Sequence, residues 1–423
     1  MRTFRASIEY PLWANTRTSP NGQFETSRVA LDGLRTKKHI TPHRPTRRNL
    51  PFALSPLLAS DKVATGEWDV RRFAYIDALR GYAILSVVTA HVALAVFPSD
   101  AIGQRLVQSG ARGVQLFFVT SAIALMFAWH SHANGTAAFF IRRLFRIAPM
   151  LWLAIPATFA VGAAIDPSGG ATWDQIAATA LFLHGLTPQW INTAVAGSWT
   201  IAVEATFYLL FPLIVVSVTS LKRAAVGLAL SFAVAAAGWF FLLSYAQALG
   251  AEPSNWRSFA FTSFVVQSPC FMIGVGTYFL IIRSDISDRM AMFAGIAALL
   301  LIGALCAVTT SSAAYIGFAF AFGALAVAFS HDRLRMLVNR PICALGLISY
   351  SAYFWHFLVL KVLSHFTSTW SFWALFAAVL PVTIALSAAT YALVEKPMIA
   401  AGVRLAMAIS DRRPRDIPAQ VRI

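Results

Sequence analysis

Charged residues are scarce in this sequence. Asp, Glu, Lys and Arg make up 12% of its 423 residues, whereas soluble domains carry about 25%. Cysteine is scarcer still: Cys270, Cys306 and Cys343 lie far apart and form no Cys-x-x-Cys pair. This excludes a disulfide-rich scaffold. The cysteines also lack metal-binding spacing, so we expect buried, unpaired thiols and no metal ion.

Apolar residues, by contrast, make up 58% of the chain. Runs of about 20 apolar residues, the length that crosses a bilayer as a helix, recur from Ile76 onward. We therefore predict an all-α fold, a polytopic transmembrane bundle of about ten spans within the lipid bilayer. The predicted spans are Ile76–Phe97, Gly113–His130, Arg143–Ala164, Trp199–Thr219, Ala224–Ala246, Phe259–Ile282, Met290–Val308, Ala313–Ser330, Ala344–Leu363 and Phe372–Val394. The shorter apolar piece Trp173–Leu186 suffices for only about half a crossing, which predicts a re-entrant or interfacial segment.

The net charge of +16 is spread unevenly: residues 1–72 carry 13 Lys and Arg against 6 Asp and Glu, and the remaining 21 Lys and Arg lie mostly between the spans. Nucleic-acid binding explains this layout poorly, whereas the positive-inside rule explains it well. With the N-terminus inside, the basic clusters all face the cytoplasm: Arg142/Arg143/Arg146, Lys222/Arg223, Arg283/Arg289, Arg333/Arg335/Arg340 and Lys396/Arg404. A full crossing by Trp173–Leu186 would move every later cluster outside. We therefore expect both termini in the cytoplasm.

The charge and apolar patterns divide the chain into three parts. Residues 1–72 are polar and basic without a sustained apolar period, which predicts a disordered cytoplasmic tail. An alternative is that the natural start lies downstream of this segment. Residues 73–400 form the predicted membrane domain, and residues 401–423 a short basic cytoplasmic tail.

The first chemical signal is a pair of ionisable residues in the first span. Arg80 and His91 are eleven residues apart, and eleven helical steps return to within about 20° of the same face. A His with an ordinary pKa near 6.5 can act as a general base, and an Arg near the inner end of the span can hold an anion. The alternative is a His that joins two helices by a hydrogen bond and an Arg that reaches the interface.

A second signal is the cluster Arg142, Arg143 and Arg146. Residues three and four apart share a helix flank, and the guanidinium fork suits phosphate oxygens at a cytoplasmic helix end. The alternative is that these residues only set the topology.

Glu204 is an acid inside an apolar span, where an unpaired carboxylate is costly. The topology places it in the outer part of its helix, on a face with Phe207 and Tyr208. It could orient His91, pair with Arg112 or contact an acceptor hydroxyl. The alternative is one structural hydrogen bond between helices.

Weaker signals come from other polar positions. Tyr350, Tyr353 and His356 recur every three residues, a stripe that suits a cavity wall. His184 could line a cavity mouth or be a satisfied packing residue. Glu395, in Glu395-Lys396-Pro397, ends the last span, and a salt bridge at the helix end explains it.

Taken together, these segments resemble the acyltransferase-3 family of integral-membrane O-acyltransferases, from about Phe73 to Ala400. The matching motifs, in order, are Ile76-Asp77-x-Leu79-Arg80-Gly81 followed by His91; Gly113-Val114-Gln115-Leu116-Phe117-Phe118-Val119-Thr120-Ser121; Arg143-x-x-Arg146 ending at Pro149; Ser198-Trp199-Thr200 with Glu204, Phe207, Tyr208 and Pro212; Ile348-Ser349-Tyr350-Ser351-x-Tyr353-x-x-His356; and Val394-Glu395-Lys396-Pro397. The sequence departs from the family pattern at Thr200, Ala205 and Ala122, which leaves the acceptor specificity open.

The resemblance implies transfer of an acyl group, usually acetyl, from cytoplasmic acyl-coenzyme A to a hydroxyl of a carbohydrate or glycolipid. It also implies a bacterial cytoplasmic (inner) membrane. Coenzyme A would be a donor substrate, with no cofactor and no metal. The implied catalytic residues are His91, as base or acyl relay, Glu204 and Arg80. The implied donor-binding residues are Arg142, Arg143 and Arg146. The implied cavity wall consists of Trp199, Tyr208, Tyr350, Tyr353 and His356.

Two other classes of function fit the same residues. A transporter or flippase of glycans or small anions would also use intramembrane Arg, His and Glu, but it needs no acyl-coenzyme A and leaves its cargo unchanged. If the protein were a non-catalytic membrane scaffold, replacing His91 would affect no property other than folding.

Overall fold

The computed structural model describes residues 73–97, 105, 107, 109–131, 135–165, 170–248, 253–282, 285–308, 312–367 and 369–411. The predicted tail 1–72 and the residues after Asp411 lie outside this part of the chain. Within it the regular structure is helical and no strand occurs. The helices are α1 (Ala74–Val96), α3 (Gly113–Ser131), α4 (Gly135–Ile165), α5 (Trp173–Ala180), α6 (Trp199–Ser217), α7 (Leu221–Ala248), α8 (Pro253–Phe261), α9 (Phe264–Ile281), α10 (Asp288–Val308), α11 (Tyr315–Ser330), α12 (Arg340–Leu347), α13 (Ser349–Phe366), α14 (Phe372–Thr390) and α15 (Lys396–Asp411), with the short turns η4 (Ser312–Ala314), η5 (Asp332–Leu337) and η6 (Tyr391–Glu395).

The all-α membrane fold is confirmed. By length and apolar composition, eight of the described helical stretches can cross a membrane, or nine if the bent pair α12 and α13 forms one span. The predicted span Ala313–Ser330 corresponds to α11, whose 16 residues fall short of a full crossing. The short segment Trp173–Leu186 forms α5, which has only 8 residues.

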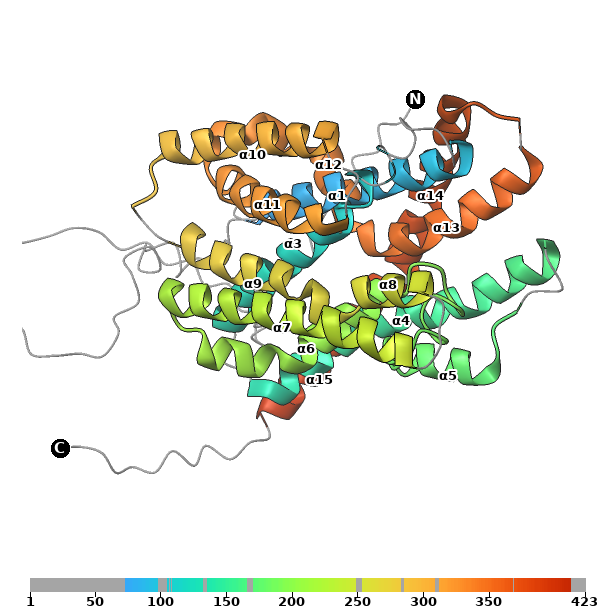
Figure 1. Ribbon diagram of the computed structural model, residues 1–423, viewed down its shortest axis with the longest axis horizontal. Coiled ribbons are helices and arrows are strands. Elements are labelled where there is room, and N and C mark those ends of the chain that lie inside the picture. The colour runs from blue at the N-terminus through green and yellow to red at the C-terminus, as the bar shows by residue number, and fades with distance from the viewer. Residues whose placement is uncertain are drawn as a thin grey trace, which may run out of the picture. The chain divides into compact units, whose positions relative to one another are not determined.

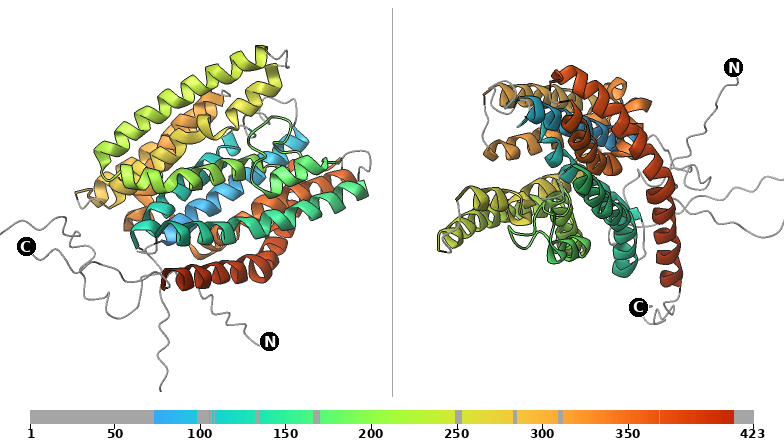
Figure 2. Two further views of the ribbon diagram at one scale, coloured as in Figure 1. Left: turned by 90° about the horizontal axis from the view of Figure 1, so that it is seen from below. Right: turned by 90° about the vertical axis from the view of Figure 1, so that its right-hand side faces the viewer.

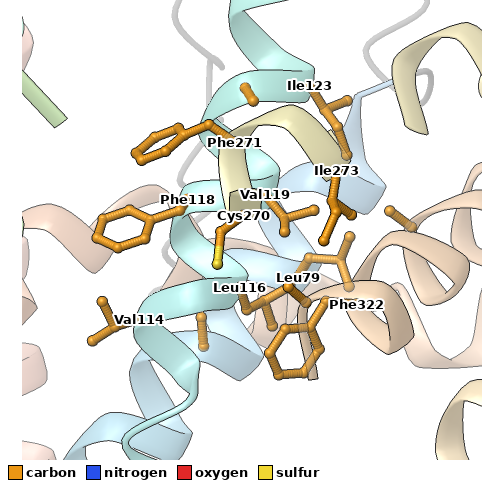
Figure 3. Packing of buried hydrophobic residues seen from close by; sticks show 14 of the residues in the cluster. Leu79, Val114, Leu116, Phe118, Val119, Ile123, Cys270, Phe271, Ile273 and Phe322 are labelled. Atoms are coloured by element: carbon orange, nitrogen blue, oxygen red, sulfur yellow. The ribbon is translucent and has the colours of Figure 1, made fainter. Parts of the chain in front are cut away.

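The core lies where α1, α3, α9 and α11 pack together (Figure 3). Phe118 of α3 stacks on Phe271 of α9 with ring centroids 4.8 Å apart, and Phe271 stacks in turn on Phe207 of α6 at 4.1 Å. Cys270 is buried in the same cluster with a free thiol. These apolar contacts hold α1 and α6, which carry the candidate catalytic residues, in one rigid unit.

Two glycines allow α12 to cross α1 at very short distance. A Cβ on Gly346 would lie 1.8 Å from the Asp77 carbonyl oxygen, and one on Gly81 would lie 2.1 Å from the Ile342 carbonyl oxygen. Only glycine avoids these clashes. The chain then bends by 76° between α12 and α13, and this bend turns α13 toward the site.

α7 and α10 are much less buried than the core helices α1, α3 and α9. α10 packs along α11, and α7 packs along α9 (Figure 1). Even so, in an 18-residue apolar stretch of each helix only 11% of α7 and 17% of α10 is buried. Their exposed side chains, which include Phe240, Phe293 and Leu300, are large and apolar. These surfaces suit contact with lipid tails.

The helix that follows the last predicted span is longer than the sequence indicated. The prediction ended the span at Val394 and gave residues 401–423 to a tail. In the structure α14 passes through one π-helical turn, η6, into α15, so the helix continues to Asp411. α15 packs along α4 (Figure 2), with Gly402 against the Phe145 side chain.

Candidate active site

A hollow between α1, α3, α4, α6 and α13 collects the polar residues of several predicted motifs. It encloses about 600 Å³ of empty space, counting the part open to solvent. Its walls are Arg80, Val114, Phe117, Phe118, Ser121, Arg146, Ile147, Thr200, Ile201, Glu204, Tyr208, Ser349, Tyr350 and Tyr353. Charged groups beside apolar and aromatic walls are typical of sites that bind small molecules.

Charges of both signs face this hollow. Arg80 and Arg146 come from α1 and α4, and both interact electrostatically with Glu204 of α6. The sequence placed Arg80 near the inner end of its span and Glu204 in the outer part of another. The structure still brings them to one hollow. The chain ahead of α6 enters the bundle, with Ala194 and Ser198 buried, so α6 begins below the surface.

Glu204 is held by hydroxyl groups. Ser121 donates a 2.6 Å hydrogen bond to its Oε1, and the Tyr208 hydroxyl donates to the same oxygen. Neither His91 nor Arg112 is among its hydrogen-bond partners in the described residues. Arg112 instead lies over the Phe261 ring, 5.6 Å from its centroid. The bond from Ser121 joins α3 to α6, which is the structural hydrogen bond between helices that the sequence left open as the alternative. Glu204 also lines the hollow, so the expected contact with an acceptor hydroxyl stays a prediction.

The arginine cluster is divided between two hollows. Arg146 faces the main hollow, whereas Arg142 and Arg143 line a smaller one of about 290 Å³ with Trp129, Phe139 and residues at the start of α4. Arg143 links the two, since its guanidinium lies 5.8 Å from the Phe139 ring centroid and 5.9 Å from that of Tyr208. The cluster is therefore more than a set of exposed charges between spans.

His91 and His356 form a pair. His356 Nε2 lies 3.3 Å from His91 Nδ1, and the two ring centroids are 5.1 Å apart. His91 Nδ1 is also 2.9 Å from the carbonyl oxygen of Val87. Phe357 closes one side of the pair, with ring centroids 4.5 Å from His91 and 4.0 Å from His356.

Tyr353 connects the histidine pair to the hollow. Its ring lines the hollow and lies 5.6 Å from the His356 ring, centroid to centroid. Its hydroxyl donates to the Gly197 carbonyl at 3.1 Å. The hollow therefore ends one aromatic ring away from the histidines.

Of the predicted cavity wall, Tyr208, Tyr350 and Tyr353 line the hollow. Trp199 does not; it packs edge-on against Phe118, with ring centroids 6.0 Å apart. His356 lies behind Tyr353 as the partner of His91. His184 is buried outside the hollow, where its Nε2 donates to the Ser198 carbonyl at 2.9 Å and burial lowers its pKa. Its Nδ1 is buried and has no hydrogen-bond partner in the described residues, so only one of the two ring nitrogens is satisfied.

Comparison with known proteins identifies the family of this chain. A family model described as an acyltransferase domain matches residues 73–392. The chain belongs to this acyltransferase family. It is also 31% identical over 156 residues to Acyltransferase MdmB of Streptomyces mycarofaciens, a match that covers 34% of this chain and 39% of that protein. No solved structure matches the chain.

The structure of this family member adds two residues, Ser121 and Glu395, that the sequence did not single out for the site. Ser121 belongs to a recognised motif, but its bond to Glu204 depends on how α3 and α6 pack. Glu395 was assigned to a salt bridge at a helix end. In the structure it is 2% exposed, accepts a hydrogen bond from Ser351 and interacts electrostatically with Arg146. The π-helical turn that carries Glu395 gave no signal in the sequence.

Proposed function

We propose that this acyltransferase is an O-acyltransferase of a bacterial cytoplasmic membrane. It moves an acyl group, acetyl in the simplest case, from cytoplasmic acyl-coenzyme A to a hydroxyl of a cell-surface carbohydrate or glycolipid. The observation that carries this proposal is the hollow that holds Arg80, Arg146 and Glu204 and ends at the Tyr353 ring, beside the His91–His356 pair. Buried ionisable groups within a membrane bundle indicate function because their burial is costly.

The arginines support an anionic donor. In the proposed complex, Arg142 and Arg143 at the smaller hollow bind phosphate groups of coenzyme A, since guanidinium forks bind phosphate oxygens in pairs. Arg146 and Arg80 at the main hollow attract the inner part of the donor. This order places the thioester end nearest Tyr353 and the histidines.

The chemistry proposed for His91 is general-base catalysis. Its ring takes the proton of the acceptor hydroxyl while that oxygen attacks the thioester carbonyl carbon. A new C–O bond forms, the C–S bond breaks, and coenzyme A leaves as a thiolate that recovers the proton from His91. General-base catalysis of this kind is worth about 10²–10⁴-fold in rate.

The test compares cells that carry the wild-type protein, His91→Ala or His365→Ala. His365 is an exposed histidine on α13 and provides the matched control. We expect mass spectrometry of envelope and secreted glycans to show one acyl unit with the wild type and His365→Ala, and none with His91→Ala at equal protein level. Acyl groups that persist with His91→Ala would overturn the catalytic role. Unchanged acylation with altered glycan amount or location would indicate a transporter instead.

A further inference from the structure

His356 is a buried histidine whose ring contacts the ring of His91. It is 0% exposed and lies on α13, four residues after Ala352 and beside Phe357. In the described residues, the side chain within hydrogen-bond distance of its ring is that of His91 on α1. The two residues are 265 positions apart in the chain, so the pair depends on the packing of α13 against α1.

The hydrogen positions in this pair follow from the carbonyl groups. His356 Nδ1 lies 3.0 Å from the Ala352 carbonyl oxygen, and a carbonyl oxygen only accepts, so Nδ1 carries the hydrogen. The Nε2 of a neutral His356 then carries a lone pair. His91 Nδ1 lies 2.9 Å from the Val87 carbonyl oxygen, so it carries a hydrogen too. This N–H is shared between the Val87 carbonyl and His356 Nε2.

One nitrogen of the pair is left for chemistry. Because Nδ1 of neutral His91 holds the hydrogen, its Nε2 carries a lone pair. No hydrogen bond engages Nε2 of His91 anywhere in the described residues. The ring is also partly exposed, whereas His356 is buried. The arrangement therefore presents a basic nitrogen of His91 and keeps the other nitrogen bound.

We propose that His356 is the positioning residue of the catalytic base: together with the Val87 carbonyl it accepts the Nδ1–H of His91, and it holds the ring and stabilises the imidazolium that forms during acyl transfer. This inference rests on the proposed function. In many enzymes a carboxylate orients the catalytic histidine. The sequence suggested Glu204 for this role, but Glu204 is bound to Ser121 and Tyr208. A neutral imidazole provides the acceptor without adding a negative charge between apolar helices, where a charge is costly.

The test uses two substitutions at one position. In His356→Gln, the amide oxygen can take the place of Nε2 and accept from His91. In His356→Leu, the volume is retained and the acceptor is lost. His365→Leu on the exposed part of the same helix is the control. The assay follows radiolabelled acetyl from acetyl-coenzyme A into envelope glycans, and gives kcat and the KM for acetyl-coenzyme A.

We expect His356→Leu to lower kcat by about a hundredfold with the KM for acetyl-coenzyme A unchanged, and His356→Gln to recover most of that loss. His91→Ala combined with His356→Leu should be no slower than His91→Ala alone, because the two residues act as a unit. Equal kcat in His356→Leu and the wild type, or equal losses in the Leu and Gln variants at normal protein level, would overturn the inference. Full activity in His91→Ala would instead overturn the proposed function itself.

Discussion

α1 and α10 are both long, apolar and able to cross a membrane, yet they lie in different surroundings. In an 18-residue apolar stretch of each helix, 50% of α1 is buried, against 17% of α10. α1 carries Asp77, Arg80 and His91 along its length, whereas the charged residues of α10 stand only at its start. Hydropathy identifies both as spans, with mean hydropathy values of 1.6 for α1 and 2.5 for α10. The two helices differ in burial. We therefore expect substitutions at the buried crossing of α1 to be tolerated far less than substitutions on the exposed helix α10.

The sharpest way to test this contrast is a pair of matched glycine substitutions. Gly346→Val pushes a side chain into the Asp77 carbonyl at the crossing of α12 and α1, whereas Gly303→Val on α10 meets nothing within 4 Å. Overpacking a buried site costs about 1–3 kcal/mol or more. Because the clash is with backbone, we expect Gly346→Val to yield little folded protein on detergent size exclusion. Gly303→Val should elute and melt like the wild type. Equal behaviour of the two variants would show that the crossing is looser than its geometry indicates.

The next contrast concerns arginines. Arg143→Ala with Arg146→Ala removes two cations that face the hollows, whereas Arg289→Ala with Arg404→Ala removes two exposed ones. A hydrogen bond to a charged group is worth about 1.5–3 kcal/mol, so losing donor contacts should raise the KM for acetyl-coenzyme A about tenfold or more. The exposed pair should leave that KM unchanged. Unaltered donor affinity in the first variant would reduce Arg143 and Arg146 to topology markers.

The sequence predicted much of this centre, because apolar runs and short motifs are local features. The helical membrane class followed from run length, and the residues Arg80, Arg146, Glu204 and Tyr353 that line one hollow all came from local motifs. The contact partners of these residues could not be predicted from the sequence. The sequence left Glu204 free to orient His91, pair with Arg112, contact an acceptor hydroxyl or make one hydrogen bond to another helix. Only the packing of α3 against α6 shows that Ser121 is its partner. The pairing of His91 with His356 depends in the same way on the bend before α13.

Glu395 is the clearest example of a residue whose contacts cannot be predicted from the sequence. A regular helix through residues 372–411 gives no reason to turn this side chain inward, and its charge next to Lys396 suggests a helix-end pair. The structure inserts a π turn, in which the Lys396 N–H donates to the Tyr391 carbonyl five residues back. As a result Glu395 is 2% exposed while Leu393 is 77% exposed. π turns often occur at functional sites, but nothing in the local composition announces one.

The smallest expected effect follows from this turn. Glu395→Gln keeps an acceptor for Ser351 but removes the charge near Arg146, whereas Lys396→Gln changes the exposed neighbour. Because Glu395 does not line the hollow, it acts on a donor only through Arg146. We expect Glu395→Gln to change the KM for acetyl-coenzyme A by a few-fold while the protein remains folded, and Lys396→Gln to have no effect. The change should vanish when Arg146 is already Ala, because the two charges are coupled. A full effect of Glu395→Gln in the Arg146→Ala background would show that Glu395 acts on the fold and not on Arg146.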